Sequence, residues 1–123
     1  MSDQNDSIHD LIPLREPTFY ILLSLSSGKQ HGYAILREVE AQSNGRVRLS
    51  TSTLYEALAR LLDQGLIERV DTPTGIEAQE RHPGRPRKSY RLSRLGKRVL
   101  HAEAERLRQM LAITQRLLSE ETG

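Results

Sequence analysis

The sequence predicts a mainly helical protein with one small β-hairpin and a long helix at its C-terminal end. Apolar residues recur at helical spacing along much of the chain, whereas residues 71–87 are interrupted by prolines and glycines and lie between two short alternating segments. The chain has 123 residues, of which 37% are hydrophobic, so it has enough apolar material for one modest core.

Residues 1–13 are expected to form a flexible arm, because they are polar and acidic and are interrupted by Pro13. The most apolar stretch, Leu14–Leu25, follows and predicts the first helix. Pro17 suits the first turn of that helix, where its missing N–H costs nothing. The run Ser26-Ser27-Gly28 is typical of a helix end.

The next two helices are predicted over His31–Gln42 and from the hydroxyl-rich run 50–53 to Gly65. Asn44-Gly45 closes the former, because glycine accepts the left-handed conformation that often ends a helix. Basic and apolar residues alternate over 46–49, so a short strand is expected there. The third helix carries leucines at helical spacing, namely Leu54, Leu58, Leu61 and Leu62.

Two short strands are predicted over Leu66–Val70 and Lys88–Leu92, and the loop Asp71–Arg87 joins them into a hairpin. In the second strand, Tyr90 and Leu92 fall on the same side, because side chains alternate along a strand.

The pattern from Ser93 to about Leu118 predicts a long amphipathic helix, whose apolar stripe has few partners left in so small a core. An exposed stripe of that length is unusual on a monomer, so we predict that it forms a homodimer. The alternative is that it folds back on the first helix of its own chain. The residues expected at the dimer interface are Leu100, Ala104, Leu107, Met110 and Leu111.

Basic residues are concentrated in residues 81–98, which hold eight of the 18 lysines and arginines and no acid, whereas the rest of the chain has 10 basic and 16 acidic residues. Such a run is often only a solvent-exposed surface without a function, but this one includes a loop that can reach outward. Nucleic acid gains affinity from a basic patch by counterion release. Arg85, Arg87 and Lys88 are therefore expected to contact DNA, and Arg85 has the chemistry to enter a narrow minor groove.

The start of the third helix indicates the same kind of partner. Capping by Ser50 or Thr51 is the simplest interpretation of its hydroxyls, yet four in a row exceed what one cap needs. A major groove admits a helix whose first turns carry short donors and acceptors. We therefore predict nucleic-acid contacts from Ser52, Thr53 and Tyr55.

Other function classes have little support in the sequence. The absence of cysteine excludes disulfides and thiolate sites, and the four histidines are scattered without a carboxylate cluster, so no metal or cofactor is expected. No nucleophile–base pair or phosphate-binding loop indicates an enzyme. No apolar run approaches the ~18 residues of a membrane span, and the acidic start is unlike a secretory leader. We expect a cytoplasmic protein with no membrane partner.

Several motifs occur in order over residues 14 to 100: His31-Gly32-Tyr33, Ser52-Thr53-Leu54-Tyr55, Gly65-Leu66-Ile67, and Arg87-Lys88-Ser89-Tyr90-Arg91-Leu92 with Gly96. Together they resemble the PadR-type transcriptional regulators, and the short C-terminal helix resembles the small subgroup of that family. The resemblance implies a winged helix-turn-helix protein, usually a homodimer that represses transcription.

The resemblance also implies roles for single residues. Ser52, Thr53 and Tyr55 would face DNA, whereas the leucine stripe of the third helix would fill the core. Residues 71–87 would form the wing, and Tyr90 would belong to the wing strand. Many members of the family have proline where this chain has glutamate at position 56, so the resemblance gives that position no role.

These expectations divide the chain into an arm (1–13), a winged helix-turn-helix domain (14–93) and a dimerisation helix (94–123). We expect a homodimeric repressor that binds an inverted repeat in double-stranded DNA. The alternative is an interaction module of the same fold that does not bind DNA. Some family members bind aromatic effectors between protomers, sometimes with the help of tryptophan. This chain has no tryptophan, so the resemblance does not imply that it binds such an effector. Any small-molecule effector is expected between protomers.

Overall fold

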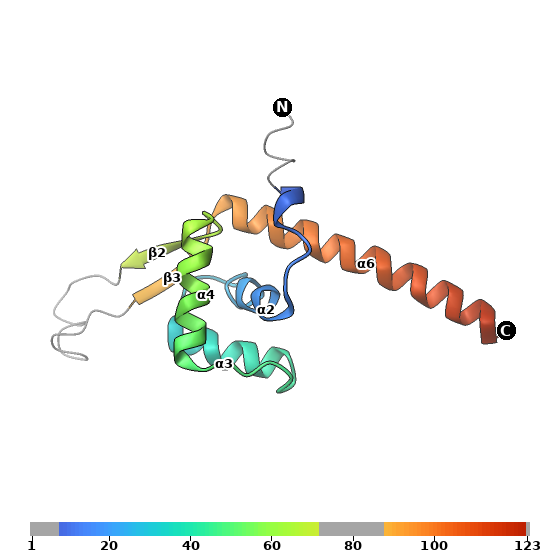
Figure 1. Ribbon diagram of the computed structural model, residues 1–123, viewed down its shortest axis with the longest axis horizontal. Coiled ribbons are helices and arrows are strands. Elements are labelled where there is room, and N and C mark those ends of the chain that lie inside the picture. The colour runs from blue at the N-terminus through green and yellow to red at the C-terminus, as the bar shows by residue number, and fades with distance from the viewer. Residues whose placement is uncertain (1–7, 72–87, 123) are drawn as a thin grey trace, which may run out of the picture.

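The computed structural model describes residues 8–71 and 88–122. Its elements are, in chain order, α2 (Glu16–Ser24), β1 (Gln30–His31), α3 (Gly32–Gln42), α4 (Thr51–Asp63), β2 (Ile67–Asp71), β3 (Lys88–Leu92) and α6 (Arg94–Thr122). Helices α2, α3 and α4 gather around the small sheet, and α6 runs away from them over most of its length (Figure 1). The predicted fold class, mainly helical with a hairpin and a long final helix, is confirmed.

The sheet has three antiparallel strands in the order β1-β3-β2. Strands β2 and β3 form the predicted hairpin, with Arg69 opposite Tyr90. Strand β1 pairs with the other edge of β3, where Gln30 lies opposite Tyr90. The sequence did not reveal β1, because a strand of two residues shows no alternation.

The strand expected over residues 46–49 is wrong, since the chain from 47 to 50 forms no strand. The buried hydroxyl of Ser43 accepts a hydrogen bond from the Val47 N–H at 3.0 Å. This backbone donor is therefore satisfied locally, without a neighbouring strand. The Val47 side chain joins the core.

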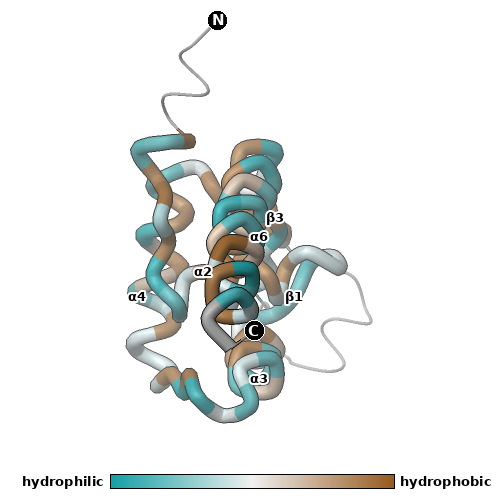
Figure 2. Tube along the Cα trace, turned by 90° about the vertical axis from the view of Figure 1, so that its right-hand side faces the viewer, coloured by the Kyte–Doolittle hydropathy of each residue, from teal (hydrophilic) through white to brown (hydrophobic). Residues whose placement is uncertain are grey.

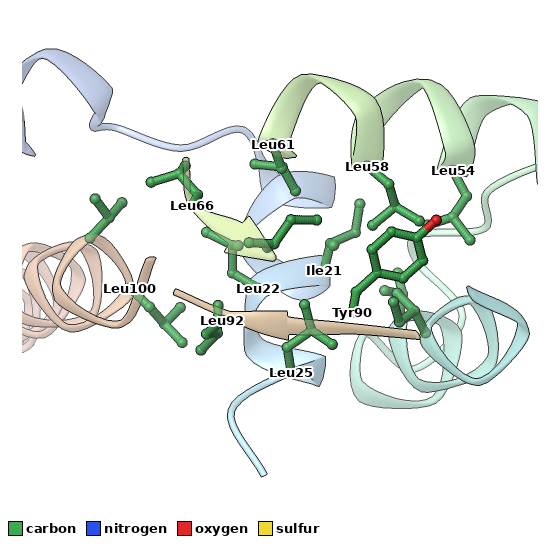
Figure 3. Close-up of a cluster of buried hydrophobic side chains, with 14 of the residues drawn as sticks. Ile21, Leu22, Leu25, Leu54, Leu58, Leu61, Leu66, Tyr90, Leu92 and Leu100 are labelled. Atoms are coloured by element: carbon green, nitrogen blue, oxygen red, sulfur yellow. The ribbon is translucent and has the colours of Figure 1, made fainter. Parts of the chain in front are cut away.

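The core lies where α2, α3, α4, the sheet and the first turns of α6 meet. Its main members are Ile21, Leu22, Leu25, Ile35, Val39, Leu54, Leu58, Leu61, Leu66, Tyr90, Leu92, Val99 and Leu100. Figure 3 shows the Tyr90 ring of β3 directed toward Leu54 and Leu58 of α4. Tyr90 thus links the hairpin to α4 through the shared core.

The flexible arm expected over residues 1–13 is wrong for residues 8–13, whereas residues 1–7 lie outside the described part of the chain. Residues 8–11 form a helical turn, and the Ile8 side chain is only 8% exposed. Leu11 and Ile12 also pack against the core. The polar composition of this stretch concealed three apolar residues at the i, i+3, i+4 spacing of one helix face.

A buried carboxylate joins this N-terminal segment to α6. Glu103 is 1% exposed and accepts hydrogen bonds from the Leu14 N–H at 2.8 Å and from two guanidinium nitrogens of Arg106 at 2.7 and 2.9 Å. The hydrogen bond from Arg106 is the main cause that lowers the pKa of Glu103, with a further contribution from the Leu14 N–H, against the opposing effect of burial. The carboxylate therefore stays ionised inside the protein at neutral pH.

Replacing Glu103 with glutamine is expected to lower the free energy of unfolding by ~2 kcal/mol at neutral pH, because charged hydrogen bonds are lost in a buried place. The pKa of Glu103 is lower in the folded than in the unfolded state, so the carboxylate stabilises the fold above the unfolded pKa. That contribution is lost as pH falls through the folded pKa. Urea unfolding of both proteins from pH 7 down to strongly acidic pH should therefore show the difference shrinking.

The matched control is Glu105→Gln. Glu105 forms the same i, i+3 pair with an arginine, Arg108, but this pair lies exposed on the helix surface. Exposed ion pairs contribute little because water and salt screen them. Equal losses of stability in the two variants would contradict a buried anchoring role for Glu103.

Candidate nucleic-acid interface

The N-terminal turn of α4 is preformed by one serine. Ser50 is the N-cap, and its hydroxyl oxygen accepts a hydrogen bond from the Thr53 N–H at 3.1 Å. The same hydroxyl donates to the Thr53 hydroxyl at 2.8 Å and lies 3.3 Å from the hydroxyl of Ser52. The capping expected from the sequence is therefore present, and it leaves exposed hydroxyl groups at the tip of the helix.

The leucine stripe and the exposed residues of α4 fall where the sequence predicts them. Leu54 and Leu58 are buried, whereas Ser52 and Thr53 are exposed. Glu56 is also exposed, one turn after Ser52 and on the same side of the helix. The N-terminal half of the outward side of α4 thus combines hydroxyl donors with the carboxylate of Glu56, which repels phosphate but can accept a hydrogen bond from a cytosine amino group.

Tyr55 lies on a different side of α4 from Thr53, because residues two apart on a helix point to opposite sides. The structure places its ring directly against the backbone of Gly32 at the start of α3, where a Cβ atom would clash with the ring. The side chain remains 41% exposed. Tyr55 therefore both fixes α3 against α4 and presents part of its ring to solvent beside the tip of α4.

Two further candidates, Tyr33 and Arg37, were not found from the sequence. Tyr33 is 68% exposed, and the Arg37 guanidinium lies 5.8 Å from the centre of its ring, in cation–π geometry. They stand one turn apart on α3, on the side opposite the buried Ile35 and Val39. An aromatic residue on the polar side of a helix is the pattern that would have revealed them.

Strand β3 is attached to the start of α3. The Ser89 hydroxyl and the His31 Nδ1 atom lie 2.8 Å apart, so they share a hydrogen bond between β3 and the N-cap of α3. Burial is the main cause that raises the pKa of Tyr90, and nearby Tyr55 raises it further. The Tyr90 hydroxyl is therefore neutral in the folded protein. These contacts hold α3, α4 and the hairpin as one unit.

The described part of the basic run, residues 88–98, does not form one patch. Lys88 is exposed at the outer end of β3, whereas Arg91 pairs with Glu68 across the hairpin at 2.9 Å. Arg94 and Lys97 are exposed on the first turns of α6. These turns begin beside the C-terminal end of α4, because the Ser93 N–H donates to the Leu66 carbonyl at 3.0 Å.

The predicted DNA contacts therefore divide into three groups. Ser52, Thr53 and Tyr55 are all exposed near the start of α4, with Tyr55 on a different side of the helix from Thr53. Lys88 lies on the hairpin at the end where β3 begins. Arg85 and Arg87 lie outside the described residues.

The sequence matches the transcriptional regulator PadR-like family over residues 21–102, which is most of the domain just described. This chain belongs to the PadR-like family. The matched region includes α3, α4, both strands of the hairpin and the first turns of α6. The resemblance predicted from the motifs is confirmed.

Solved structures of PadR-like proteins have the same fold. A PadR family transcription regulator from Clostridium difficile R20291 is 23% identical, with a TM-score of 0.66 and coverage of 85% of this chain and 99% of that one. A transcriptional regulator from Clostridium thermocellum is 22% identical, with a TM-score of 0.62 and coverage of 90% and 93%. Bacillus subtilis PadR, solved in complex with operator DNA, is 28% identical, with a TM-score of 0.59 and coverage of 73% and 47%. This chain thus spans about half of the last protein. No curated protein matches the sequence.

The five residues predicted to form the dimer interface of this PadR-like chain fall into a buried group and an exposed group. Leu100 is buried in the core of its own chain, because the first turns of α6 pack there, so its assignment to the exposed stripe is corrected. The other four are exposed on α6, and further large apolar residues follow them along the helix: Ala104, Leu107, Met110 and Leu111, then Ile113, Leu117 and Leu118. Figure 2, which colours the chain by hydropathy, shows apolar and polar segments alternating along this helix.

Neither a metal cluster nor a membrane-spanning helix occurs in the described part of the PadR-like chain. No three histidine, aspartate or glutamate side chains in residues 8–71 and 88–122 are placed to hold a metal ion. None of the described helices is long and apolar enough to cross a membrane.

Proposed function

We propose that this chain is a homodimeric repressor that binds a specific sequence in double-stranded DNA. The observation that carries the proposal is the tip of α4, where the exposed hydroxyls of Ser52 and Thr53 stand on a helix already capped by Ser50. Such a turn enters a major groove without reorganisation, and its short side chains reach base edges. The similarity to a PadR solved with operator DNA supports this proposal.

The other groups have positioning roles in the proposal. In helix-turn-helix proteins the helix before the recognition helix crosses the DNA backbone, and α3 presents Tyr33 and Arg37 at its exposed side. We assign phosphate contacts to these two residues and to Lys88, Arg85 and Arg87. Phosphate contacts supply affinity and register, whereas base contacts supply specificity.

The proposed dimer is formed by the exposed apolar residues of α6. A two-fold dimer places two copies of α4 on one face, so its operator is an inverted repeat with half-sites about 34 Å apart. Repression follows from occupancy of the operator, and the protein needs no chemistry of its own. A location in the cytoplasm is part of the same proposal.

Selection of bound sequences from random double-stranded DNA tests the proposal. The expected result is an enriched inverted repeat, with a binding affinity that falls as salt is raised. Enriched sites without dyad symmetry would contradict the dimeric arrangement. A selection that enriches nothing would favour the alternative of an interaction module without DNA binding.

The variant Ser52→Ala is expected to relax sequence preference by ~1–3 kcal/mol for each base contact it removes. The free energy of unfolding should hardly change, because Ser50 supplies the cap. Ser50→Ala is the matched control, since it removes the cap and lowers stability by ~1 kcal/mol. Binding to operator and to scrambled DNA, measured side by side, checks this. Equal loss on both DNAs would show that Ser52 contacts only phosphate.

A further inference from the structure

A pocket of about 370 Å³ lies between the segment that precedes α2 and the C-terminal half of α4. This volume is at the lower end of the range for pockets that bind small molecules. The pocket is part of a single chain, so it differs from a site between protomers. It has an aliphatic floor made by Leu11, Leu14, Leu61 and Leu66.

The floor favours an alkyl group. Leu61 and Leu66 are buried in the core, as Figure 3 shows, and Leu11 and Leu14 are half-buried above them. None of the described residues that line the pocket is aromatic. Flexible alkyl chains gain from covering such a surface, whereas flat rings find no ring to stack on.

The rim favours an anion. Arg15 and Arg60 both line the pocket, both are exposed, and neither forms an ion pair with a described residue. Glu16, the acid next to Arg15, is instead engaged by Arg46 at 2.9 Å. The amino end of α2 opens on the same side and adds to the positive potential. Guanidinium groups bind carboxylates with paired, charge-assisted hydrogen bonds.

We propose that this pocket binds a small aliphatic carboxylate, with its head group between Arg15 and Arg60 and its alkyl chain on the leucine floor. An inorganic anion would leave the floor exposed to water, and a neutral alkyl compound would leave both guanidiniums without a partner. The two features of the pocket are satisfied together only by a ligand that has both parts.

The walls of the pocket connect it to the proposed DNA-binding and dimerisation elements. One wall is α4, and the other is the segment whose Leu14 N–H is held by Glu103 of α6. If the two walls take up more than one relative position, a carboxylate that binds one of these positions more tightly increases its population. Such a shift changes the affinity of the protein for DNA. This consequence, unlike the binding itself, rests on the proposed function.

Calorimetric titration of the full chain with octanoate, octanamide and inorganic phosphate tests the site. Octanoate is expected to bind at least tenfold more tightly than either of the other two. Arg15→Gln and Arg60→Gln should each weaken octanoate binding about tenfold, and Ala57→Leu should abolish it by filling the pocket. Arg48→Gln, which changes an exposed arginine outside the pocket, should leave it unchanged.

Four results would overturn the proposal. Phosphate binding as tight as octanoate would remove the alkyl requirement, and octanamide binding as tight would remove the anion requirement. Octanoate binding that survives both arginine variants would place the site elsewhere. Binding that occurs only in a monomeric variant would show that a second protomer covers the pocket. Because the titrations contain no DNA, these results are independent of the operator selection, and either proposal can fail alone.

Discussion

Replacing Gly96 with alanine is expected to lower the free energy of unfolding by ~3 kcal/mol and the melting temperature by roughly 10–20 °C. Gly96 lies in the first turn of α6, where its N–H donates to the capping hydroxyl of Ser93 at 3.0 Å. A Cβ atom there would lie inside the contact distance of the Leu66 carbonyl oxygen and 3.0 Å from the carbonyl carbon. Both groups are backbone, so neither can rotate away as a side chain does.

Gly65→Ala is the matched control, because Gly65 neighbours the same contact. Its φ of +74° disfavours alanine, but a Cβ atom would meet nothing within 4 Å. Its cost is therefore the backbone strain alone, ~1–2 kcal/mol. Urea unfolding followed by circular dichroism measures both variants. A smaller loss of stability for Gly96→Ala than for Gly65→Ala would show that α6 moves freely on Leu66.

Local periodicity explains why so much of this fold was predictable. The leucines of α4, and Tyr90 and Leu92 of β3, recur at the spacing of one side of a helix and of a strand, so the sequence indicates both the element and the side that carries its apolar core residues. Leu54, Leu58, Tyr90 and Leu92 are accordingly all in the core. The family motifs lie in the same elements, which is why the resemblance agreed with the periodicity.

Contacts between distant residues explain the errors. Nothing near residue 14 indicates that its N–H meets a carboxylate 89 residues away, so the segment 8–13 resembled a free arm. Likewise, Gln30–His31 is a strand only because β3 has a free edge beside it. The last error has the same origin, since periodicity assigns Leu100 to the stripe of α6 but cannot say where that helix leaves the core.

The candidate nucleic-acid interface likewise has residues that local sequence patterns predict and residues that depend on contacts between elements. Ser52 and Thr53 were predicted because a cap and a run of hydroxyls are local patterns. That Tyr55 packs against Gly32 depends on how α3 meets α4, and no spacing in the sequence reports it. The described part of the basic run, residues 88–98, is continuous along the chain, but it passes from β3 into α6. Helix α6 begins beside the C-terminal end of α4, so Arg94 and Lys97 lie away from the tip of α4.

Replacing both Leu107 and Leu111 with glutamate is expected to convert the proposed dimer to a single chain and to weaken operator binding ~100-fold or more. Both side chains are exposed in the single chain, at 38% and 55%, so the substitutions should not disturb its core. Two charges buried in an apolar interface without partners strongly oppose association. Losing one protomer removes the second half-site contact, and such paired contacts commonly strengthen binding by 10²–10⁴-fold.

The control is Gln109→Glu with Ala112→Glu, which adds two glutamates to the same helix on the side away from Leu107 and Leu111. Light scattering should report one chain for the Leu107/Leu111 variant and two for the control, with similar melting of the winged helix in both. Operator titration should then separate the two variants by at least the expected factor. A dimer that survives the Leu107/Leu111 substitutions would place the interface on another face, and the apolar residues of α6 would then need a different partner, because they have no core of their own to fill.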